Sequence, residues 1–235
     1  MSAKKKSAPP VAAKNARIGV VLAAGKGQRM GGPKALLAWP RAGVRAGHPP
    51  IGRPEPSAEV PLAVAHAEAL LVAGCDRVLV VTRAPWLGPL LSYAHPGIDL
   101  VVSDFPDELG PAGTLACATQ RIEGASLVVV VPVDMPPVRT DTVARLCARL
   151  EEADAPLAAR PRYGGHRGHP VALRPAALEP YRTPPAGGPP PLRHRLHDLG
   201  ERCVDVDVDD GSIRIDLDTA GDVKALLGAP PRFCG

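Results

Sequence analysis

The sequence has few aromatic residues and no closely paired cysteines, and each shortage narrows the class of protein. Phenylalanine, tryptophan and tyrosine together make up 3% of the 235 residues, so the core is expected to consist of valine, leucine and alanine. The five cysteines are spread singly along the chain without a CxxC pair, which argues against a zinc site or a disulfide framework. No stretch approaches the roughly 18 consecutive apolar residues of a membrane-spanning helix. A globular protein of a reducing compartment, the cytoplasm, is expected.

The excess of basic charge is confined to the N-terminus. Residues 1–17 contain several lysines and an arginine but no acid, so they account for the net charge of +4 and leave the remainder slightly acidic. A basic body with interleaved aromatics, which nucleic-acid binding favours, is absent. Prolines and charges follow the first lysines, where a secretion signal needs an apolar stretch of roughly 7 to 15 residues. Neither nucleic acid nor a membrane is therefore expected as a partner.

Four apolar runs rich in β-branched residues alternate with helical patterns. The runs lie at 17–22, 77–82, 99–103 and 127–133, and the candidate helices lie at 60–74, 86–94, 112–124 and 140–152. Such unbroken apolar runs are typical of strands that are buried on both faces. Strands alternating with helices predict an α/β fold with a mostly parallel, Rossmann-like sheet flanked by helices. Two later segments, 169–175 and 203–210, are predicted to extend the sheet.

Two proline-rich segments interrupt the pattern, at 40–61 and 180–191. Proline lacks a backbone N–H and stops helices and central strands, so both segments are predicted to be loops. The length fits one large domain better than two small ones. The expected organisation is a disordered basic tail at 1–16, one domain at 17–228 that carries 40–61 as an insertion, and a second tail at 229–235.

The turn after the first predicted strand combines glycines with cations. It contains Gly25, Gly27, Gly31 and Gly32, interleaved with Lys26, Arg29 and Lys34. Glycine lets backbone N–H groups approach a ligand closely, as in loops that bind phosphates. The cations would oppose the charge of a triphosphate. The turn has neither the GxxxxGK[ST] pattern of a Walker A loop nor the GxGxxG spacing of a dinucleotide site, and ordinary loops are also rich in glycine.

Asp134 follows the predicted strand at 127–133. The carboxyl ends of parallel strands form the edge at which open α/β sheets bind ligands. A carboxylate there suits Mg²⁺, which prefers a few carboxylate oxygens together with phosphate oxygens and water. The alternative interpretation of Asp134 is a helix N-cap.

Four motifs resemble those of the MobA-like nucleotidyltransferase family. LAAGKGQRMGGPKALL at 22–37 resembles the nucleotide-binding signature of the family, and PVDMPP around Asp134, GHPV at 168–171 and IDLDTAGDV at 215–223 follow in the family's order. The resemblance as a whole covers about residues 17–228. The resemblance implies the nucleotide-diphospho-sugar transferase fold, which is like glycosyltransferase A. It also implies Mg²⁺-dependent transfer of a nucleotide from a nucleoside triphosphate to a small phosphorylated acceptor.

The resemblance further implies a nucleotide-binding set. Its members are Leu22, Ala23, Ala24, Gly25, Lys26, Gly27, Arg29, Lys34, Ser103, Asp104 and Gly113. Arg29, Lys34 and Asp134 would be catalytic, because the cations neutralise phosphates and the acid holds the metal. In IDLDTAGDV, alanine and glycine replace the proline and acid of the family pattern, and Asp216 or Asp218 would complete the metal site.

The resemblance also assigns an acceptor side and leaves several residues to structural roles. His166, Gly168, His169 and Pro170 would contact the acceptor, although an isolated histidine in a turn is more often structural. Thr219 is expected to cap the helix that follows it, with Asp222 in the first turn. The HxxH pattern of His194 and His197 lacks the glutamate of a zinc protease and is expected at the surface.

Several functions stay open at this point. LAAG in place of LAGG, and GHPV, resemble the family members that use CTP, with molybdopterin as the acceptor. GTP-dependent transfer to the same cofactor and transfer to a sugar or alcohol phosphate are alternatives. Two further alternatives are a non-catalytic module that delivers cofactor to a molybdoenzyme and an oxidoreductase of the nicotine blue type. The insertion at 40–61 leaves the acceptor open.

Overall fold

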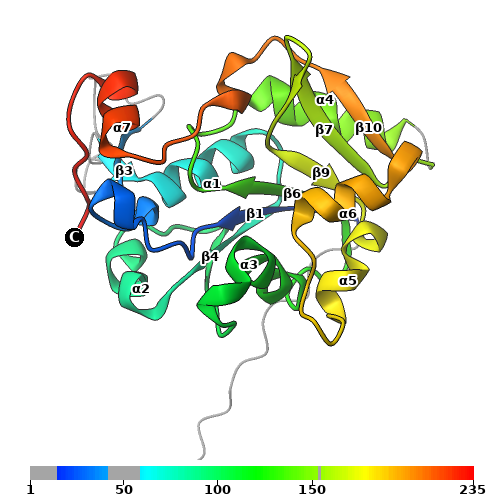
Figure 1. The fold of residues 1–235 in the computed structure, drawn as a ribbon, viewed down its shortest axis with the longest axis horizontal. Helices are drawn as coiled ribbons and strands as arrows, with labels where there is room; N and C mark the ends of the chain where they lie inside the picture. Colours follow the sequence, from blue (N-terminus) through cyan, green and yellow to red (C-terminus); the bar gives the residue numbers. More distant parts are fainter. Residues whose placement is uncertain (1–14, 42–58, 153–154) are drawn as a thin grey trace, which may run out of the picture.

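A twisted, mostly parallel sheet runs through the centre of the molecule (Figure 1). The structure is a computed structural model that describes residues 15–41, 59–152 and 155–235. In these residues the main sheet has eight strands in the order β10-β7-β9-β6-β1-β4-β5, and β8 pairs with β7 at the side. The four predicted core strands are confirmed as β1 (Ala16–Leu22), β4 (Arg77–Thr82), β5 (Ile98–Val102) and β6 (Ala125–Pro132). They are parallel to one another, with β1 between β4 and β6.

The second half of the chain adds four strands on the β6 side. These are β7 (Ala158–Tyr163), β8 (His166–Arg167), β9 (Val171–Leu173) and β10 (Cys203–Asp207). The strand predictions at 169–175 and 203–210 are therefore confirmed. β9 lies antiparallel to β6 and to β7, whereas β10 is parallel to β7. Strand β7 was missed, because its sequence AARPRY has arginines and a proline where an apolar run would signal a strand.

Helices cover both faces of the sheet (Figure 1). The helices are α1 (Leu62–Val72), α2 (Ala84–Leu91), α3 (Gly110–Thr119), α4 (Thr140–Glu151), α5 (Glu179–Arg182), α6 (Leu192–Asp198) and α7 (Ala220–Leu227). One hydrophobic cluster joins the sheet to α1 and α4, and another joins it to α3, α5 and α6. Strand β1 serves both, because Val21 packs in the first cluster and Val20 in the second. This double burial explains its unbroken apolar sequence.

Both proline-rich segments begin or end in regular secondary structure. Most of the 40–61 segment, residues 42–58, lies outside the described residues. The short strands β2 (Ala38–Pro40) and β3 (Glu59–Pro61) on either side of it pair antiparallel in a two-stranded sheet. The prediction that 180–191 is entirely a loop is wrong at its start, because Pro180 is tolerated in the first turn of α5.

The structure describes only the second of the two predicted tails in full. Residues 1–14 lie outside the described residues. The C-terminal segment packs on the domain, because the Ala38 N–H donates to the Arg232 carbonyl at 2.8 Å and the Cys234 N–H donates to the Leu36 carbonyl at 2.8 Å. The domain bounds 17–228 stay a prediction. Within the described part of the chain, no helix has the length and apolar character to span a membrane.

Candidate active site

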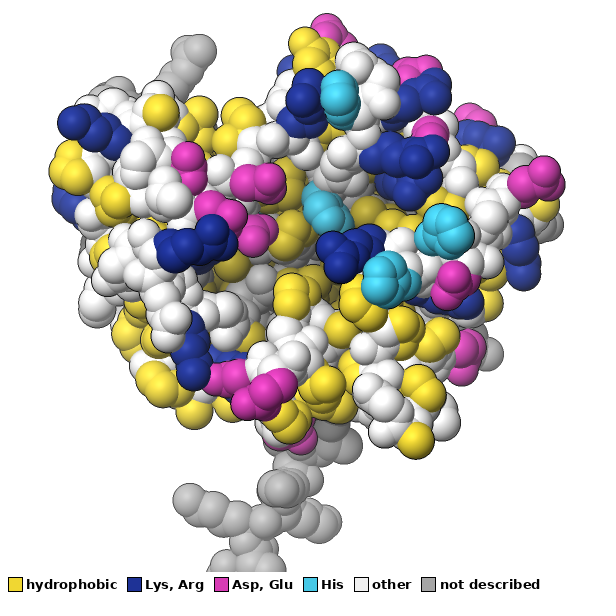
Figure 2. Space-filling model, in the orientation of Figure 1, with side chains coloured by type: hydrophobic (Ala, Val, Ile, Leu, Met, Phe, Trp, Pro, Cys, Tyr) yellow, Lys and Arg dark blue, Asp and Glu magenta, His cyan; other side chains and the backbone are white. Residues whose placement is uncertain are grey.

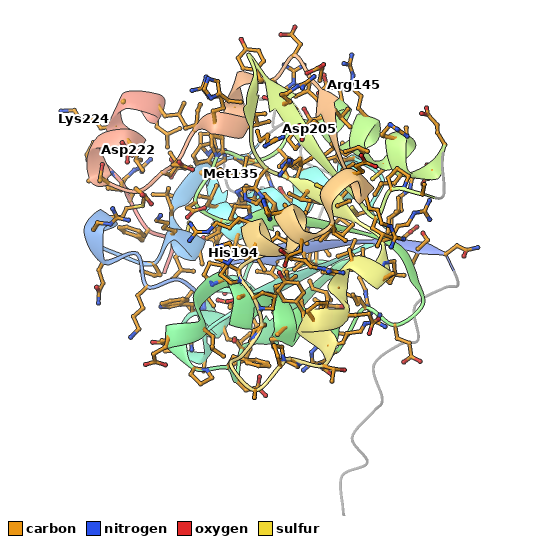
Figure 3. All side chains as sticks on the ribbon, turned by 45° about the vertical axis from the view of Figure 1, so that its right-hand side comes forward. Met135, Arg145, His194, Asp205, Asp222 and Lys224 are labelled. Atoms are coloured by element: carbon orange, nitrogen blue, oxygen red, sulfur yellow. The ribbon has the colours of Figure 1, made fainter. Side chains whose placement is uncertain are left out.

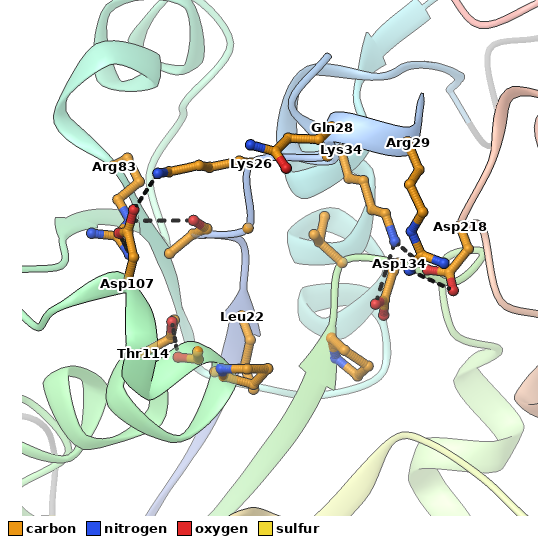
Figure 4. Close-up of a pocket in the computed structure, with 17 residues that line it drawn as sticks. Leu22, Lys26, Gln28, Arg29, Lys34, Arg83, Asp107, Thr114, Asp134 and Asp218 are labelled. Carbon is orange, nitrogen blue, oxygen red and sulfur yellow. Dashed lines mark hydrogen bonds and ion pairs between the residues drawn. The ribbon is translucent and has the colours of Figure 1, made fainter. Parts of the chain in front are cut away.

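A cleft of about 630 Å³ opens at the carboxyl ends of β1 and β6 (Figure 4). Four segments meet there: the glycine-rich turn after β1, the end of β4 with the start of α3, the end of β6, and the loop before α7. The lining residues are Leu22, Ala24, Gly25, Lys26, Gly27, Gln28, Arg29, Lys34, Arg83, Asp107, Gly110, Pro111, Thr114, Pro132, Val133, Asp134 and Asp218. The cleft thus occupies the sheet edge that the sequence predicted.

The glycine-rich turn is folded tightly on itself. Gly27 has a left-handed backbone with φ of 61°, and a Cβ atom there would lie 2.0 Å from the carbonyl oxygen of Gly32. A side chain at this position would therefore force the turn open. The turn is anchored to the sheet, because the Ala23 N–H donates to the Val81 carbonyl at 2.8 Å. Ala23 is fully buried and supports the turn from behind, without lining the cleft.

Lys34 is the most buried of the three predicted cations and reaches two carboxylates. Its side chain is 12% exposed, and its Nζ lies 2.7 Å from Asp218 Oδ1 and 3.6 Å from Asp134 Oδ2. Arg29, which is 73% exposed, lies 3.2 Å from the other oxygen of Asp218. The expected convergence of the cationic turn with Asp134 and Asp218 is therefore present in the structure (Figure 4). The catalytic roles of these residues stay predictions.

A backbone hydrogen bond brings the two acidic segments together. The Leu217 N–H donates to the Asp134 carbonyl at 2.7 Å, so Asp216 and Asp218 are held beside the end of β6. Loss of surrounding water, followed by the negative charges of Asp134 and Asp218, raises the pKa of Asp216. In contrast, the hydrogen bond from Lys34 and then its charge lower the pKa of Asp218. Asp216 does not line the cleft itself.

These carboxylates fit a divalent cation. Burial is the first cause that raises the pKa of Asp216, and the negative charge of Asp134 is the second; a cation between the segments would compensate these negative charges. Among the described residues, no three histidine, cysteine or acidic side chains form a complete metal-binding set. The protein could therefore supply only part of the coordination shell, which suits an ion that takes its other ligands from phosphates and water.

A second ion-pair cluster lies at the opposite end of the cleft (Figure 4). Asp107 forms ion pairs with Lys26 Nζ, at 2.6 Å, and with Arg83. The Arg83 guanidinium also donates to the carbonyls of Ala24, at 3.2 Å, and Phe105, at 3.3 Å. Sequence reasoning missed both Arg83 and Asp107. Arg83 had a usable signal, because it directly follows strand β4 at the ligand-binding edge, the argument that identified Asp134.

The start of α3 differs from the expectation for this region. The helix begins at Gly110 and not near Gly113, so Gly110, Pro111 and Thr114 line the cleft. A Cβ atom at Gly113 would lie 2.8 Å from Leu109 Cβ, which indicates a packing role. The two polar residues predicted here, Ser103 and Asp104, do not line the cleft: Ser103 is buried and Asp104 is exposed.

The predicted acceptor residues lie outside the lining of the cleft. His166 is exposed in β8, where it pairs with Tyr163. Gly168 allows close packing, because a Cβ atom there would lie 2.2 Å from the Ile213 carbonyl oxygen. Burial lowers the pKa of His169, and the charges of Asp134 and Asp216 oppose this shift, so His169 lies near the carboxylates. Pro170 is buried beside it.

Two structural expectations, for the start of α7 and for the histidines of α6, are confirmed. Thr219 and Asp222 form a capping box at the start of α7, in which the Thr219 N–H donates to the Asp222 carboxylate at 2.7 Å. His194 and His197 are exposed on α6, as expected for surface residues. Figure 3 places His194 on α6 and Asp222 on α7, on separate parts of the molecule. On the face in Figure 2, acidic side chains with basic ones beside them lie on one side of the centre, and basic and histidine side chains lie on the other.

Comparisons with known proteins find one matching domain family and several relatives. The profile of the MobA-like NTP transferase domain matches residues 19–194. A curated relative, the molybdenum cofactor guanylyltransferase of Xanthomonas euvesicatoria pv. vesicatoria, is 32% identical over 150 residues, which are 60% of this chain and 63% of the relative. The chain thus spans less than two thirds of the length of that relative.

Solved structures of low sequence identity share the fold. A manganese complex of Rv0371c from Mycobacterium tuberculosis H37Rv has a TM-score of 0.65 at 24% identity, covering 92% of this chain and 100% of that chain. A nucleotidyl transferase from Methanothermobacter thermautotroptrophicus has a TM-score of 0.64 at 23% identity, covering 91% and 96%. The predicted fold class, a single α/β domain of the nucleotide-diphospho-sugar transferase type, is confirmed.

Proposed function

The chain belongs to the MobA-like NTP transferase family, and on this premise we propose that it is a magnesium-dependent nucleotidyltransferase. It moves a nucleoside monophosphate from a nucleoside triphosphate to a small phosphorylated acceptor and releases pyrophosphate. The observation that carries the proposal is the meeting of a cationic glycine-rich turn with carboxylates in one cleft, where Lys34 Nζ lies 3.6 Å from Asp134. Cations and a metal-holding acid are the groups that phosphoryl chemistry uses.

The chemistry needs no side-chain nucleophile. An oxygen of the acceptor phosphate attacks the α-phosphorus in line and forms a new P–O bond. The bond between the α-phosphorus and the bridging oxygen of pyrophosphate breaks, and its electron pair leaves with pyrophosphate. Lys26, Arg29 and Lys34 would neutralise the phosphate oxygens during this step. In the structure these cations form ion pairs with the carboxylates of Asp107 and Asp218, at the positions where phosphate oxygens would bind. Because a phosphate acceptor is already ionised at neutral pH, a general base is not required.

Asp134 with Asp216 or Asp218 would hold Mg²⁺ at the end of β6. When bound, the ion supplies charge neutralisation at the phosphate oxygens. The raised pKa of Asp216 supports this assignment, because burial and then the negative charges of Asp134 and Asp218 cause it, and a bound cation would compensate those charges. The manganese complex of the mycobacterial structure supports a divalent metal in this fold.

CTP is the proposed donor and molybdopterin the proposed acceptor. Ala24 within LAAG, and GHPV at 168–171, support CTP, because family members that use CTP carry these forms. GTP is the second candidate, because the curated relative is named a guanylyltransferase. The proposed setting is the cytoplasm, with a molybdoenzyme as the partner that receives the finished cofactor. The absence of a GxGxxG fingerprint disfavours the oxidoreductase alternative.

A donor-by-acceptor screen tests this proposal. The purified chain is incubated with Mg²⁺, with CTP, GTP or UTP, and with molybdopterin or a sugar or alcohol phosphate, and pyrophosphate release is measured. The expected result is release with CTP and molybdopterin. Release with GTP alone would replace the donor, and release with a sugar or alcohol phosphate alone would replace the acceptor. Silence in every combination would exclude a transferase and leave the cofactor-delivery module.

Asp107→Asn is expected to tighten nucleotide binding. The substitution releases Lys26 and Arg83 from their acidic partner, so triphosphate binding no longer has to break these ion pairs. Ion pairs between exposed side chains contribute little, so the Kd for the nucleotide should fall only about threefold, and by less at high salt. Titration calorimetry with CTP checks this. Glu108→Gln, an exposed neighbour outside the cleft lining, removes the same charge and should leave the Kd unchanged.

A further inference from the structure

A buried histidine contacts the backbone directly beside Asp134. His66 lies on α1 with no exposed surface, and its Nε2 is 2.9 Å from the carbonyl oxygen of Met135. Because a carbonyl oxygen can only accept, Nε2 must carry the proton and donate it. Burial lowers the pKa of His66 to about 4, so the ring is neutral at neutral pH. Figure 3 shows Met135 near the centre of the molecule.

The loop after β6 is held from two sides. The Met135 carbonyl accepts from His66 on α1, and the Asp134 carbonyl accepts from the Leu217 N–H at 2.7 Å. Pro136 and Pro137 follow, and neither has an N–H that could anchor the loop. We call these two hydrogen bonds, made by His66 and Leu217 to the Asp134–Met135 backbone, the carbonyl clamp. Through it, α1, the end of β6 and the segment with Asp216 and Asp218 form one unit.

Core packing alone does not account for a histidine at this position. The other ring nitrogen of His66, Nδ1, is buried without a hydrogen-bond partner among the described residues. A buried polar atom without a partner destabilises a fold, and an apolar side chain of similar volume would avoid that penalty. The donated hydrogen bond to Met135 is what the histidine adds over such a side chain. Its effect falls on the loop that carries Asp134.

We propose that His66 is a positioning residue that fixes Asp134 relative to Asp216 and Asp218, and so tunes the binding of a divalent cation. This inference rests on the proposed function for its metal site. Residues that orient metal ligands from behind typically change metal affinity about 10- to 100-fold when they are replaced. The clamp acts on the ligand through the backbone, because the hydrogen bond from His66 goes to the carbonyl of Met135, the residue directly after Asp134.

Binding of Mn²⁺ alone to the purified full chain tests the clamp without requiring turnover. His66→Leu keeps a similar volume and removes the donor, and it should weaken Mn²⁺ binding about 10- to 100-fold. His66→Gln keeps an amide N–H that can reach Met135 and should restore most of the affinity. Leu70→Ala is the matched control, because Leu70 is buried on the same helix but packs towards Gly19 and Val78. It should lower the melting temperature and leave Mn²⁺ affinity unchanged.

Three results would overturn the clamp: unchanged Mn²⁺ affinity in a folded His66→Leu protein, an equal loss in Leu70→Ala, or no Mn²⁺ binding by the unaltered chain. If His66→Leu fails to fold, His66→Asn takes its place, because its shorter amide cannot reach the carbonyl. Equal affinities of the Asn and Gln variants would then overturn the proposal. If Mn²⁺ binding depends on His66 but the chain releases no pyrophosphate in the screen, the transferase proposal is wrong and the carbonyl clamp is still supported.

Discussion

Asp134→Asn is expected to lower kcat by about three orders of magnitude, the scale of losing a main charge-stabilising group. The substitution removes one carboxylate of the proposed metal site and keeps the size of the side chain. The fold should survive, because the Asp134 side chain is 42% exposed and its backbone carbonyl keeps the hydrogen bond from Leu217. The pKa of Asp216 should also fall, because the charge of Asp134 is one of the causes that raise it.

Pyrophosphate release and thermal unfolding, measured on the same samples, check this expectation. Asp99→Asn is the control. Asp99 lies near the start of β5, at the edge of the sheet opposite the cleft, and its carboxylate pairs only weakly with Arg77 at 3.5 Å. It should keep full activity. Near-normal kcat in Asp134→Asn would remove this residue from the metal site, whereas a large drop in melting temperature would mean that the acid is needed for folding.

Lys34→Gln is expected to lower kcat/KM about 100-fold and also to destabilise the protein at neutral pH. Lys34 is 12% exposed and balances both Asp218 and Asp134, so its loss leaves these two carboxylates and the nearby Asp216 with less compensating charge. The pKa of Asp218, which Lys34 now lowers, should rise. A carboxyl group whose folded pKa is lowered stabilises the fold while it is ionised, and Lys34→Gln removes the main cause of that stabilisation at Asp218.

The loss of stability in Lys34→Gln should therefore depend on pH. The loss of stability should be largest at neutral pH, where the carboxylates are ionised. It should become smaller as the pH falls to about 4, where carboxyl groups take up protons. Melting temperatures of both proteins between pH 7 and pH 4 measure this. Arg29→Gln is the matched comparison, because Arg29 is 73% exposed and, within the described residues, forms an ion pair with Asp218 only. If Arg29→Gln lowered the melting temperature as much as Lys34→Gln, the explanation from the burial of Lys34 would be wrong.

Local patterns predicted much of the fold. The runs that became β1, β4, β5 and β6 are apolar without alternation, because each strand is covered on both faces. Strand β7 escaped prediction because its arginines pair with acids of β10, as Arg160 does with Asp205 at 2.6 Å. A strand whose side chains are paired charges lacks the apolar pattern from which strands are predicted.

The chain by itself determined the family motifs, the core strands and the chemistry of the cationic turn. It did so because periodicity, glycine conformation and side-chain charge are properties of short segments. Only the tertiary structure decided which acid each cation meets, since Lys34 and Asp218 are 184 residues apart. It also revealed the pair of Arg83 with Asp107, and the hydrogen bond from His66 to the backbone beside Asp134. These contacts depend on the register in which distant strands and helices pack, which no single segment encodes.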